Sequence, residues 1–433
     1  MSEEFEHIEE VMSEGFEGKE VSIRGWIYRT RSSGGVHFVV VRDSTGIIQC
    51  IVRKGSVSEK AFEDAGKALI ESSVQVRGVV RKDARAPGGY ELDTTDFKVT
   101  HFSEVFPITK DKSTEFLLDV RHLWLRSRML TAVMKVKATV LSAAREFFAQ
   151  NGYVETTPPI ITGSACEGGA TLFTVDYFGQ KAYLSQSVQL YLEALIYSLE
   201  KVYCISPSFR AEPSRTLRHL AEYWHIEPEA AYADLEDVMK LSEEFVMFTV
   251  EKVLEKNKKE LELLGREPEA LKRISAPFPR MRYSEAIDLL QKEGLPIKFG
   301  QDLGADEEKA MSAHFDQPVF VTHYPKEVKA FYMRENREDP KFVNNFDLLA
   351  PEAHGELIGG SEREEEFDRL LANIKRVGED PKSYEWYLDL RRYGSVPHAG
   401  FGAGAERIVK WLCNLEHIRD AIPFPRTINR ATP

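Results

Sequence analysis

The stretch FRAEPSRTLRHLAEYWHIEPE, residues 209–229, gathers arginines, carboxylates and aromatic residues in one short segment. We expect two strands joined by a loop. Because side chains alternate along a strand, Arg210 and Glu212 would share one face of the first strand. Glu227 and Glu229 would share one face of the second for the same reason. The segment therefore predicts a hairpin that carries several charges on one side.

The loop of this hairpin is rich in cations that can fold over a polyphosphate: Arg215, Arg218 and His219. Tyr223 follows with an aromatic ring that a base can stack on. The ligand that needs cations, carboxylates and a stacking ring together is ATP with Mg²⁺. A surface hairpin held by salt bridges is the alternative.

A second segment, HAGFGAGAER at 398–407, spaces its glycines at every other position. Such glycines allow close approach by a ligand or by a neighbouring element. Arg407 would lie near the start of a helix, where its guanidinium matches a phosphate or an adenine face. Glycines that merely pack a helix on a strand are the alternative.

A third segment, FDLLAPEAHGELIGGSERE at 346–364, places Asp347 and Glu356 among apolar strand residues. A lone carboxylate is costly in such surroundings, so a cation is expected beside it. Mg²⁺ prefers oxygen ligands of this kind. Two carboxylates satisfied at strand ends are the alternative.

The N-terminal part reads as a small β-barrel. Short runs rich in β-branched and aromatic residues occur at 21–28, 36–43, 47–54, 73–82 and 90–102, with one possible helix at 57–69. Such a pattern favours a closed barrel of the OB type, which frequently binds single-stranded nucleic acid. A small barrel without a ligand is the alternative.

The remaining chain predicts an α+β fold. Apolar residues at helical spacing predict a long helix over 129–150, which Asn151 and Gly152 end. Further helices are expected at 186–200, 234–263, 283–293, 362–376 and 403–416. Further strands are expected at 181–184, 201–206, 222–229, 318–323, 328–334, 343–349 and 355–359. Because strands and helices do not alternate strictly, we expect an antiparallel sheet flanked by helices.

Composition excludes several classes of protein. The 433 residues carry a net charge of −12 and four scattered cysteines without a CxxC pair, which disfavours a disulfide framework or a zinc site. The acidic N-terminus lacks the apolar core of a signal peptide, and no apolar run is long enough to span a membrane. We therefore expect a cytoplasmic protein. The motifs GxxxxGK[ST], HExxH and GxSxG are absent.

The three charged segments, in this order and behind a barrel, resemble the class II aminoacyl-tRNA synthetases of the aspartate, asparagine and lysine subgroup. The resemblance covers nearly the whole chain. Residues 129–159, 209–229 and 398–407 resemble the family's motifs 1, 2 and 3. It implies an OB-fold anticodon-binding domain at 1–104, a hinge at 105–128 and a catalytic domain at 129–433. It also implies a homodimer formed through the motif 1 region.

The implied reaction has two steps and uses ATP and Mg²⁺. An amino acid attacks the α-phosphate of ATP, which gives an aminoacyl-adenylate and pyrophosphate, and the terminal ribose of a tRNA then takes the aminoacyl group. Such chemistry depends on positioning and charge neutralisation.

The resemblance also implies roles for individual residues. The catalytic residues are Arg210, Glu356 and Arg407. ATP would be bound by Arg210, Glu212, Arg218, His219, Tyr223, Glu356 and Arg407, and Mg²⁺ by Glu356 and Asp347. The amino acid would be bound by Glu167, Ser185, Gln189, Arg210, Glu227 and Arg363. The anticodon would be read by Phe38, Gln49 and Glu91, although Phe38 could instead be a core aromatic.

The segment QLYLE at 189–193 bears on the choice of amino acid. Aspartate enzymes of the subgroup carry QLYKQ here, and their lysine pairs with the substrate's carboxylate. Leu192 and Glu193 replace that lysine and the following glutamine. Glu227 could accept from a carboxamide and Arg363 could donate to it, while Glu227 would repel aspartate. The resemblance is therefore to the members that join L-asparagine to tRNA(Asn).

Three other interpretations stay open. The first is an aspartyl enzyme that does not discriminate between tRNAs, and the second is an asparagine synthetase derived from a synthetase paralogue. The third is an RNA-binding protein without activity. The sequence also departs from the family at Ala405, where a bulky residue is usual, and Ala403 stands two residues earlier. We expect a looser pocket beneath the glycines there.

Overall fold

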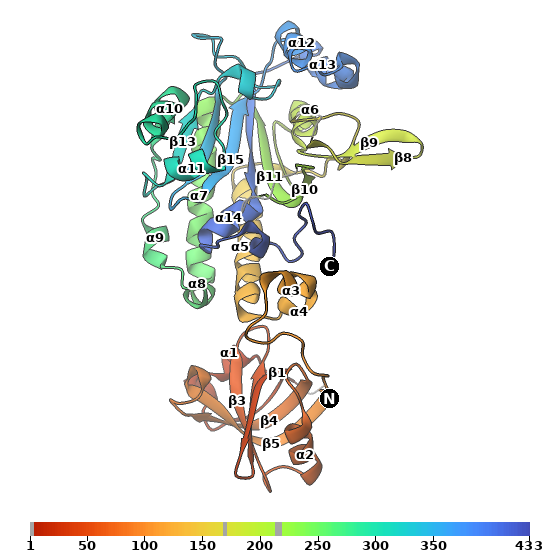
Figure 1. Ribbon diagram of the computed structural model, residues 1–433, viewed down its shortest axis with the longest axis vertical. Helices are drawn as coiled ribbons and strands as arrows, with labels where there is room; N and C mark the ends of the chain where they lie inside the picture. Colours follow the sequence, from red (N-terminus) through yellow and green to blue (C-terminus); the bar gives the residue numbers. More distant parts are fainter. Residues whose placement is uncertain (1–3, 168–170, 213–218) are drawn as a thin grey trace. The chain divides into compact units, whose positions relative to one another are not determined.

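The structure is a computed structural model that describes residues 4–167, 171–212 and 219–433. The chain divides into two compact units between Leu117 and Leu118 (Figure 1). This division lies inside the connector expected at 105–128. Among the described helices, none is both long and apolar enough to cross a membrane.

The first unit is the predicted OB-type barrel. Its strands are β1 Glu20–Ser33, β2 Val36–Arg42, β3 Ile47–Arg53, β4 Ser73–Lys82 and β5 Tyr90–His101, closed in the order β1-β2-β3-β5-β4. Val39 and Val41 point into the barrel core, so Phe38, which directly precedes Val39, points outward. Helix α2 Glu59–Lys67 begins where the Ser58 side chain accepts from Ala61 N, a usual N-terminal cap.

The second unit is built on an eight-stranded sheet of order β12-β13-β14-β15-β16-β11-β10-β6. Its strands are β6 Val154–Glu155, β10 Lys201–Phe209, β11 Glu222–Ala231, β12 Arg280–Arg282, β13 Val319–Thr322, β14 Asn345–Ala350, β15 Gly355–Glu362 and β16 His398–Gly404. The sheet is antiparallel except for the pair at each edge, β12–β13 and β6–β10, which is parallel. A small separate sheet holds β7 Ile161–Thr162, β8 Thr174–Tyr177 and β9 Gln180–Leu184.

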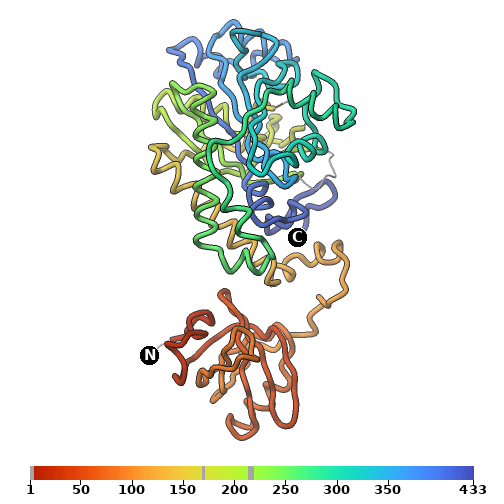
Figure 2. Tube along the Cα trace, turned by 90° about the vertical axis from the view of Figure 1, so that its left-hand side faces the viewer, coloured from red at the N-terminus to blue at the C-terminus, as the bar shows by residue number. Residues whose placement is uncertain are grey.

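Two long helices cover one face of the large sheet. Helices α5 Arg128–Gln150 and α7 Leu235–Lys256 lie side by side (Figure 2). Their apolar residues share one core with Ile226, Phe346 and Phe401 of the sheet. Because Ile226 of β11 faces these helices, its neighbours His225 and Glu227 face the opposite side. The polar side chains His225 and Glu227 therefore lie on the face of the sheet that α5 and α7 do not cover.

The other helices complete the second unit. They are α3 Thr114–Asp119, α4 Arg121–Trp124, α6 Gln189–Leu199, α8 Lys258–Leu264, α9 Pro268–Lys272, α10 Tyr283–Lys292, α11 Ala305–Ser312, α12 Phe367–Arg376, α13 Glu385–Arg392 and α14 Ala405–Leu412; α3 begins in the first unit. Helix α1 Ile8–Val11 buries Ile8 and Val11 in the barrel core.

One strand expected in the sheet is absent from the described residues, and one strand was not predicted. The strand expected at 328–334 is a short 3₁₀ turn, Lys326–Val328, followed by irregular backbone that meets the end of β15 at isolated contacts, among them Arg334 N to Glu362 O at 3.1 Å and a bridge between Met333 and Arg363. Conversely, 398–404 forms the central strand β16, although its glycines disfavour a strand. Pairing with β11 on one side and β15 on the other outweighs that local preference.

Candidate active site

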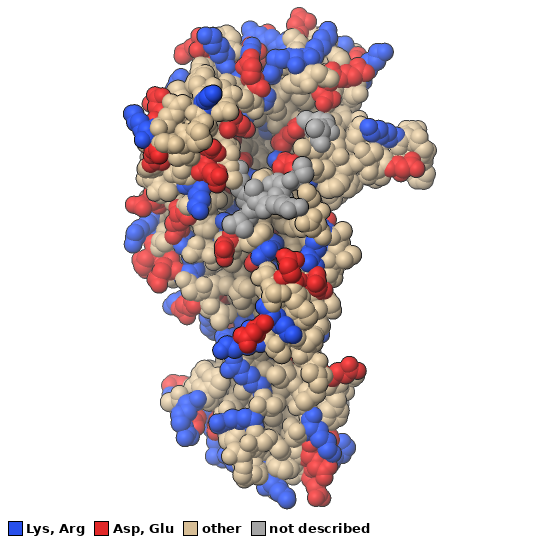
Figure 3. Space-filling view, in the orientation of Figure 1, with Lys and Arg blue, Asp and Glu red and all other residues tan. Residues whose placement is uncertain are grey.

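A cavity of about 540 Å³ opens on the face of the large sheet opposite α5 and α7. Side chains of β11, β14, β15 and β16 line it, together with the irregular segment 327–333. Figure 3 shows the hollow from outside, with acidic and basic side chains around it. A smaller pocket of about 50 Å³ adjoins the cavity and shares Arg210, His219, Glu356 and Arg407 with it.

The glycines of β16 make room for the functional side chains of β11. A Cβ atom at Gly402 would lie 2.5 Å from His225 Nε2, and one at Gly400 would lie 2.1 Å from Glu229 Oε2. Both positions therefore require glycine. Ala403 and Ala405 are fully buried in the core with α5 and α7. Their small side chains do not loosen the pocket, so that expectation was wrong.

Arg210 lies in the loop after β10 rather than on the strand. Its backbone N–H donates to Ala221 O at 3.0 Å, and the next N–H, of Ala211, donates to Thr171 O at 2.8 Å. The first of these bonds still pairs Arg210 with the residue opposite it, whereas the second turns Ala211 away from the β10–β11 ladder, so the strand alternation expected for Arg210 and Glu212 does not extend to Glu212. The Arg210 guanidinium is instead 2.5 Å from Glu167 and 3.8 Å from Glu212.

The smaller pocket is lined by groups that suit the base and the phosphates of a nucleotide. Tyr223 forms one wall, and His219 and Arg407 form others. Arg407 Nη1 is 2.9 Å from Glu356 Oε2, and His219 Nε2 is 3.5 Å from Glu212 Oε2. Cations beside an aromatic face suit a nucleotide. The predicted ligand Arg218 lies outside the described residues.

Two carboxylates meet above Gly359. A Cβ atom there would lie 3.2 Å from Glu356 Oε1 and 3.5 Å from Asp347 Oδ1. Burial raises the pKa of Asp347 to about 7, although Lys329, whose Nζ lies 3.0 Å from Asp347, opposes the shift. Hard oxygen donors in a low-dielectric site fit a divalent cation such as Mg²⁺. The same Lys329 also contacts Asp302 at 3.1 Å.

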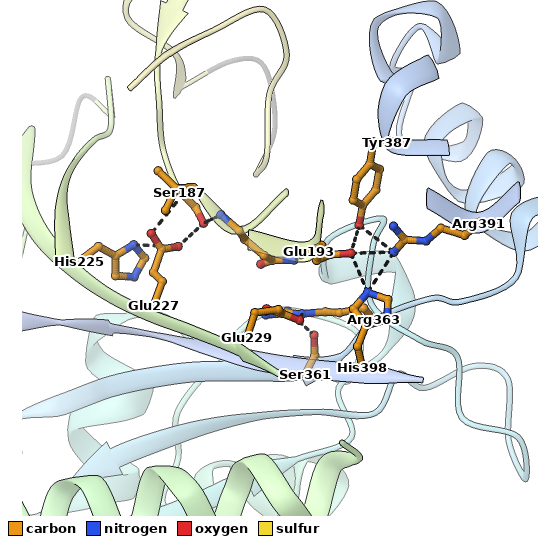
Figure 4. A network of polar contacts seen from close by, with 12 residues as sticks. Ser187, Glu193, His225, Glu227, Glu229, Ser361, Arg363, Tyr387, Arg391 and His398 are labelled. Carbon is orange, nitrogen blue, oxygen red and sulfur yellow. Dashed lines mark hydrogen bonds and ion pairs between the residues drawn. The ribbon is translucent and has the colours of Figure 1, made fainter. Parts of the chain in front are cut away.

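The opposite end of the cavity holds Glu227 and Arg363, which do not pair with each other. Glu227 accepts from Ser187 Oγ and from Val188 N at 3.2 Å. Burial raises the pKa of Glu227 to about 7, and its hydrogen bonds to Ser187 and Val188 oppose this. Arg363 donates twice to Glu229, at 3.0 and 2.9 Å, and once to Ser361 at 2.8 Å (Figure 4).

The remaining predicted amino-acid residues take different places. Glu167 and Gln189 line the cavity. Ser185 lies behind it, because its Oγ donates to Ser187 O at 2.7 Å and Ser187 is the residue that lines the cavity. Ser187 was therefore missed, although it stands only two positions from the predicted serine.

A buried ion pair joins the three motif segments and was also missed. Glu406 of α14 accepts from Lys137 Nζ of α5 at 2.5 Å and from the backbone N–H of Trp224 on β11 at 2.9 Å. The pairing of β11 with β16 ends at His225 and Gly404, and the contact between Glu406 and Trp224 links the two segments just beyond that point. A lysine on the apolar face of the 129–150 helix was the signal that could have revealed it. His225 and Lys329 were missed as well, although His225 stands within the motif 2 segment 209–229.

The predicted anticodon residues lie together on the outside of the barrel. Phe38 is half-buried, absent from the barrel core, and has the Arg31 guanidinium 4.3 Å from its ring centre. Gln49 and Glu91 are paired across β3 and β5, with Gln49 Nε2 donating to Glu91 Oε2 at 3.1 Å. An aromatic ring beside polar side chains that can hydrogen-bond to bases is the usual arrangement of a surface that binds single-stranded nucleic acid.

Known proteins resemble both units. Residues 113–428 match the model of the class II tRNA synthetases (D, K and N), and residues 21–100 match that of the OB-fold nucleic acid binding domain. The asparagine–tRNA ligase of Thermoplasma acidophilum is 52% identical, covering 98% of this chain and 99% of its own. That of Thermococcus kodakarensis is 53% identical, covering 96% and 97%.

Solved structures agree over the whole chain. The asparaginyl-tRNA synthetase of Pyrococcus horikoshii complexed with asparaginyl-adenylate is 52% identical, with a TM-score of 0.96, covering 99% of this chain and 100% of its own. The Entamoeba histolytica asparaginyl-tRNA synthetase in complex with asparaginyl-adenylate is 34% identical, with a TM-score of 0.89, covering 97% and 98%. The chain therefore belongs to the class II tRNA synthetases of the aspartate, lysine and asparagine group.

Proposed function

We propose that the chain ligates L-asparagine to tRNA(Asn). Asparagine attacks the α-phosphate of ATP, which releases pyrophosphate and forms asparaginyl-adenylate. The terminal ribose of the tRNA then takes the asparaginyl group and AMP leaves. The observation that carries this function is the end of the cavity where a carboxylate, Glu227, and a fixed guanidinium, Arg363, face the same space.

These two groups are complementary to a carboxamide. Glu227 accepts from the amide NH₂. Arg363 has five N–H donors, of which three serve Glu229 and Ser361, so two remain for the amide oxygen. Aspartate would place a carboxylate against Glu227, which costs affinity. Leu192, which replaces the lysine of aspartate enzymes, is fully buried in an apolar cluster with Val188 and Ile196.

The phosphates lie at the other end in this proposal. Arg210 holds the α-phosphate and the amino acid's carboxylate, while Glu167 takes the α-ammonium. Arg218, His219 and Arg407 bind the distal phosphates, and Tyr223 stacks on adenine with Glu212 at its amino group. The lining of the smaller pocket by Tyr223, His219 and Arg407 supports this placement. Fixed cations around the reacting phosphate stabilise the charge that develops there.

Mg²⁺ fits Glu356 and Asp347, whose carboxylates converge above Gly359. When bound, the ion would neutralise phosphate charge. Glu356 also holds Arg407 in place through their 2.9 Å contact.

The remaining assignments concern the whole protein. We assign anticodon binding to residues 1–104, with Phe38 stacking on a base and Gln49 and Glu91 reading the central uridine. Residues 105–128 act as a hinge, and 129–433 as the catalytic domain, which dimerises through the motif 1 region. Val154 in that region is 44% exposed, which supports an apolar interface. The four cysteines are free, which supports a reducing cytoplasm.

The test is ATP–pyrophosphate exchange with Mg²⁺ and either asparagine or aspartate, followed by charging of tRNA(Asn). Exchange and charging with asparagine alone support the proposal. Exchange with aspartate and charging of tRNA(Asn) would indicate the non-discriminating aspartyl enzyme. Exchange without charging would indicate the synthetase paralogue, and activity in neither assay would indicate a binding protein.

A further inference from the structure

Glu193 is a fully buried carboxylate that does not line the cavity. Its Oε2 atom accepts from Tyr387 at 2.6 Å, from Arg391 at 2.7 Å and from His398 at 2.9 Å (Figure 4). The same helix, α6, begins with Gln189, which does line the cavity. Glu193 thus connects the amino-acid end of the cavity with α13 and β16 behind it.

The second oxygen of Glu193 determines how Gln189 is turned. Gln189 Nε2 donates to Glu193 Oε1 at 2.9 Å. A carboxylate only accepts, so the NH₂ group of Gln189 must point toward Glu193. The carbonyl oxygen, on the other corner of the amide, then points away from Glu193, and Gln189 lines the cavity. A glutamine at position 193 would impose no such choice, since its amide can accept or donate.

The surrounding charges keep Glu193 ionised. His398 lies close as well, with Nε2 2.9 Å from Glu193 Oε2 and Nδ1 2.7 Å from Val396 O. Burial opposes ionisation, yet Arg391 and His398 hold the pKa of Glu193 well below its ordinary value. The oxygens of Glu193 and Glu229 are taken up by Arg391 and Arg363, so a metal ion is not needed there.

We propose that Glu193 is a positioning residue that fixes the Gln189 carboxamide with its oxygen toward the bound amino acid, where it accepts from an N–H donor of asparagine. This role rests on the proposed function. Asparagine offers two kinds of donor, its α-ammonium group and its side-chain NH₂. Either would meet an oxygen acceptor instead of a second NH₂ group.

The test compares Glu193→Gln with the wild-type enzyme in pyrophosphate exchange. The KM for asparagine should rise about tenfold or more, because the amide at 189 is no longer held in one orientation. The KM for ATP should stay within about twofold, since Gln189 lies at the amino-acid end. Tyr387→Phe is the matched control, because it removes a donor from Oε2 and leaves the contact between Oε1 and Gln189.

A second variant guards against misfolding. Glu193→Gln combined with Arg391→Met removes one anion and one cation, so the network keeps its net charge. It should raise the KM for asparagine as the single variant does. An unchanged KM in a folded variant, with wild-type enzyme active on asparagine, overturns the role of Glu193 alone. A wild-type enzyme inactive with asparagine overturns the proposed function instead.

Inhibition by succinamate, which is asparagine without its α-amino group, identifies the donor. If Gln189 accepts from the side-chain NH₂, Glu193→Gln weakens inhibition by succinamate as much as it weakens the binding of asparagine. If Gln189 accepts from the α-ammonium, Glu193→Gln weakens the binding of asparagine and leaves inhibition by succinamate unchanged. Both results support the proposal, whereas equal affinity of both enzymes for both compounds contradicts it.

Discussion

The two ends of the cavity hold their charges differently. At the amino-acid end, the side chains of the pairs Arg363–Glu229 and Arg391–Glu193 are at most 3% exposed. At the phosphate end, those of Arg210–Glu167 and Arg407–Glu356 are between 22% and 31% exposed. The first end is buried like a protein core, and the second is partly open to solvent.

This difference indicates which contacts a substrate replaces. Removing one partner from a buried pair is costly, because the other charge stays without compensation. A pair that is partly open to solvent is screened by water and separates more easily than a buried one. We therefore expect Arg363 to keep Glu229 when asparagine binds. Arg210 and Glu167 should part, Arg210 for a phosphate and Glu167 for the α-ammonium.

The largest effect is expected for Arg210→Ala. Pyrophosphate exchange should fall by about 10²–10³-fold or more, because the phosphate loses a fixed counter-charge. Arg280→Ala, which removes an exposed arginine paired with Glu236, serves as the control. Normal exchange by Arg210→Ala would mean that the phosphate end has been misassigned.

Glu227→Gln tests the amino-acid end. The kcat/KM for asparagine should fall by about 10–100-fold, since a buried acceptor is replaced by a group that can also donate. The ratio of asparagine to aspartate activity should fall too. The exposed Glu236→Gln is the control. An unaltered preference for asparagine would remove Glu227 from the account of specificity.

Phe38→Ala tests whether the barrel serves tRNA binding independently of the two ends of the cavity. Charging of tRNA(Asn) should fall by about 10–100-fold through the loss of base stacking. Pyrophosphate exchange should be unaffected, because it needs no tRNA. An equal loss in both assays would show that Phe38 supports the fold and does not read the anticodon.

Lys137→Met should act on the phosphate end from a distance. It leaves Glu406 buried without its cation and so disturbs the contact with Trp224 beside Tyr223. We expect a lower melting temperature and a KM for ATP raised by less than about tenfold, with the KM for asparagine unchanged. Adding Glu406→Gln should restore stability, since the glutamine oxygen can still accept from Trp224. A double variant no more stable than the single one would contradict this pairing.

The smallest effect is a pH dependence. Burial raises the pKa of Glu227 to about 7, and protonation removes its charge and turns one of its two acceptor oxygens into a donor, which weakens its bond to the amide. The kcat/KM for asparagine should therefore fall, by less than about tenfold, as the pH drops from 7.5 to 6. His225 stays neutral in this range, because burial lowers its pKa to about 4.

Stability should change in the opposite direction. The folded-state pKa of Glu227 lies above its unfolded value, so the folded state binds more protons between about pH 4.5 and 7. The contribution of Glu227 to the free energy of unfolding thus decreases as the pH rises through this window. Comparing urea denaturation of the wild type and Glu227→Gln at both pH values measures it. A difference that is independent of pH would contradict the shift.

Local patterns predicted the barrel and the long helix. Alternating β-branched residues define each barrel strand, and apolar spacing defines α5. The strand β16 was not predicted, because its glycines oppose a strand locally and are required by His225 and Glu229 on the neighbouring strand. That requirement exists only in the folded sheet.

The site was predicted where charges gather along the sequence, as with Arg210 and Glu356. The buried network was not, because its members are distant in the chain. Glu193 lies 198 residues from Arg391 and 205 from His398. The sequence showed Glu193 as a substitution in QLYLE, but only the fold shows what it holds.

The most direct test of the difference between the two ends is a crystal structure with a non-hydrolysable sulfamoyl analogue of asparaginyl-adenylate. We predict that Arg363 keeps both bonds to Glu229, near 3.0 and 2.9 Å, while Arg210 leaves Glu167 for the sulfamoyl group. An intact Arg210–Glu167 pair, or an Arg363 that turns away from Glu229, would contradict the account.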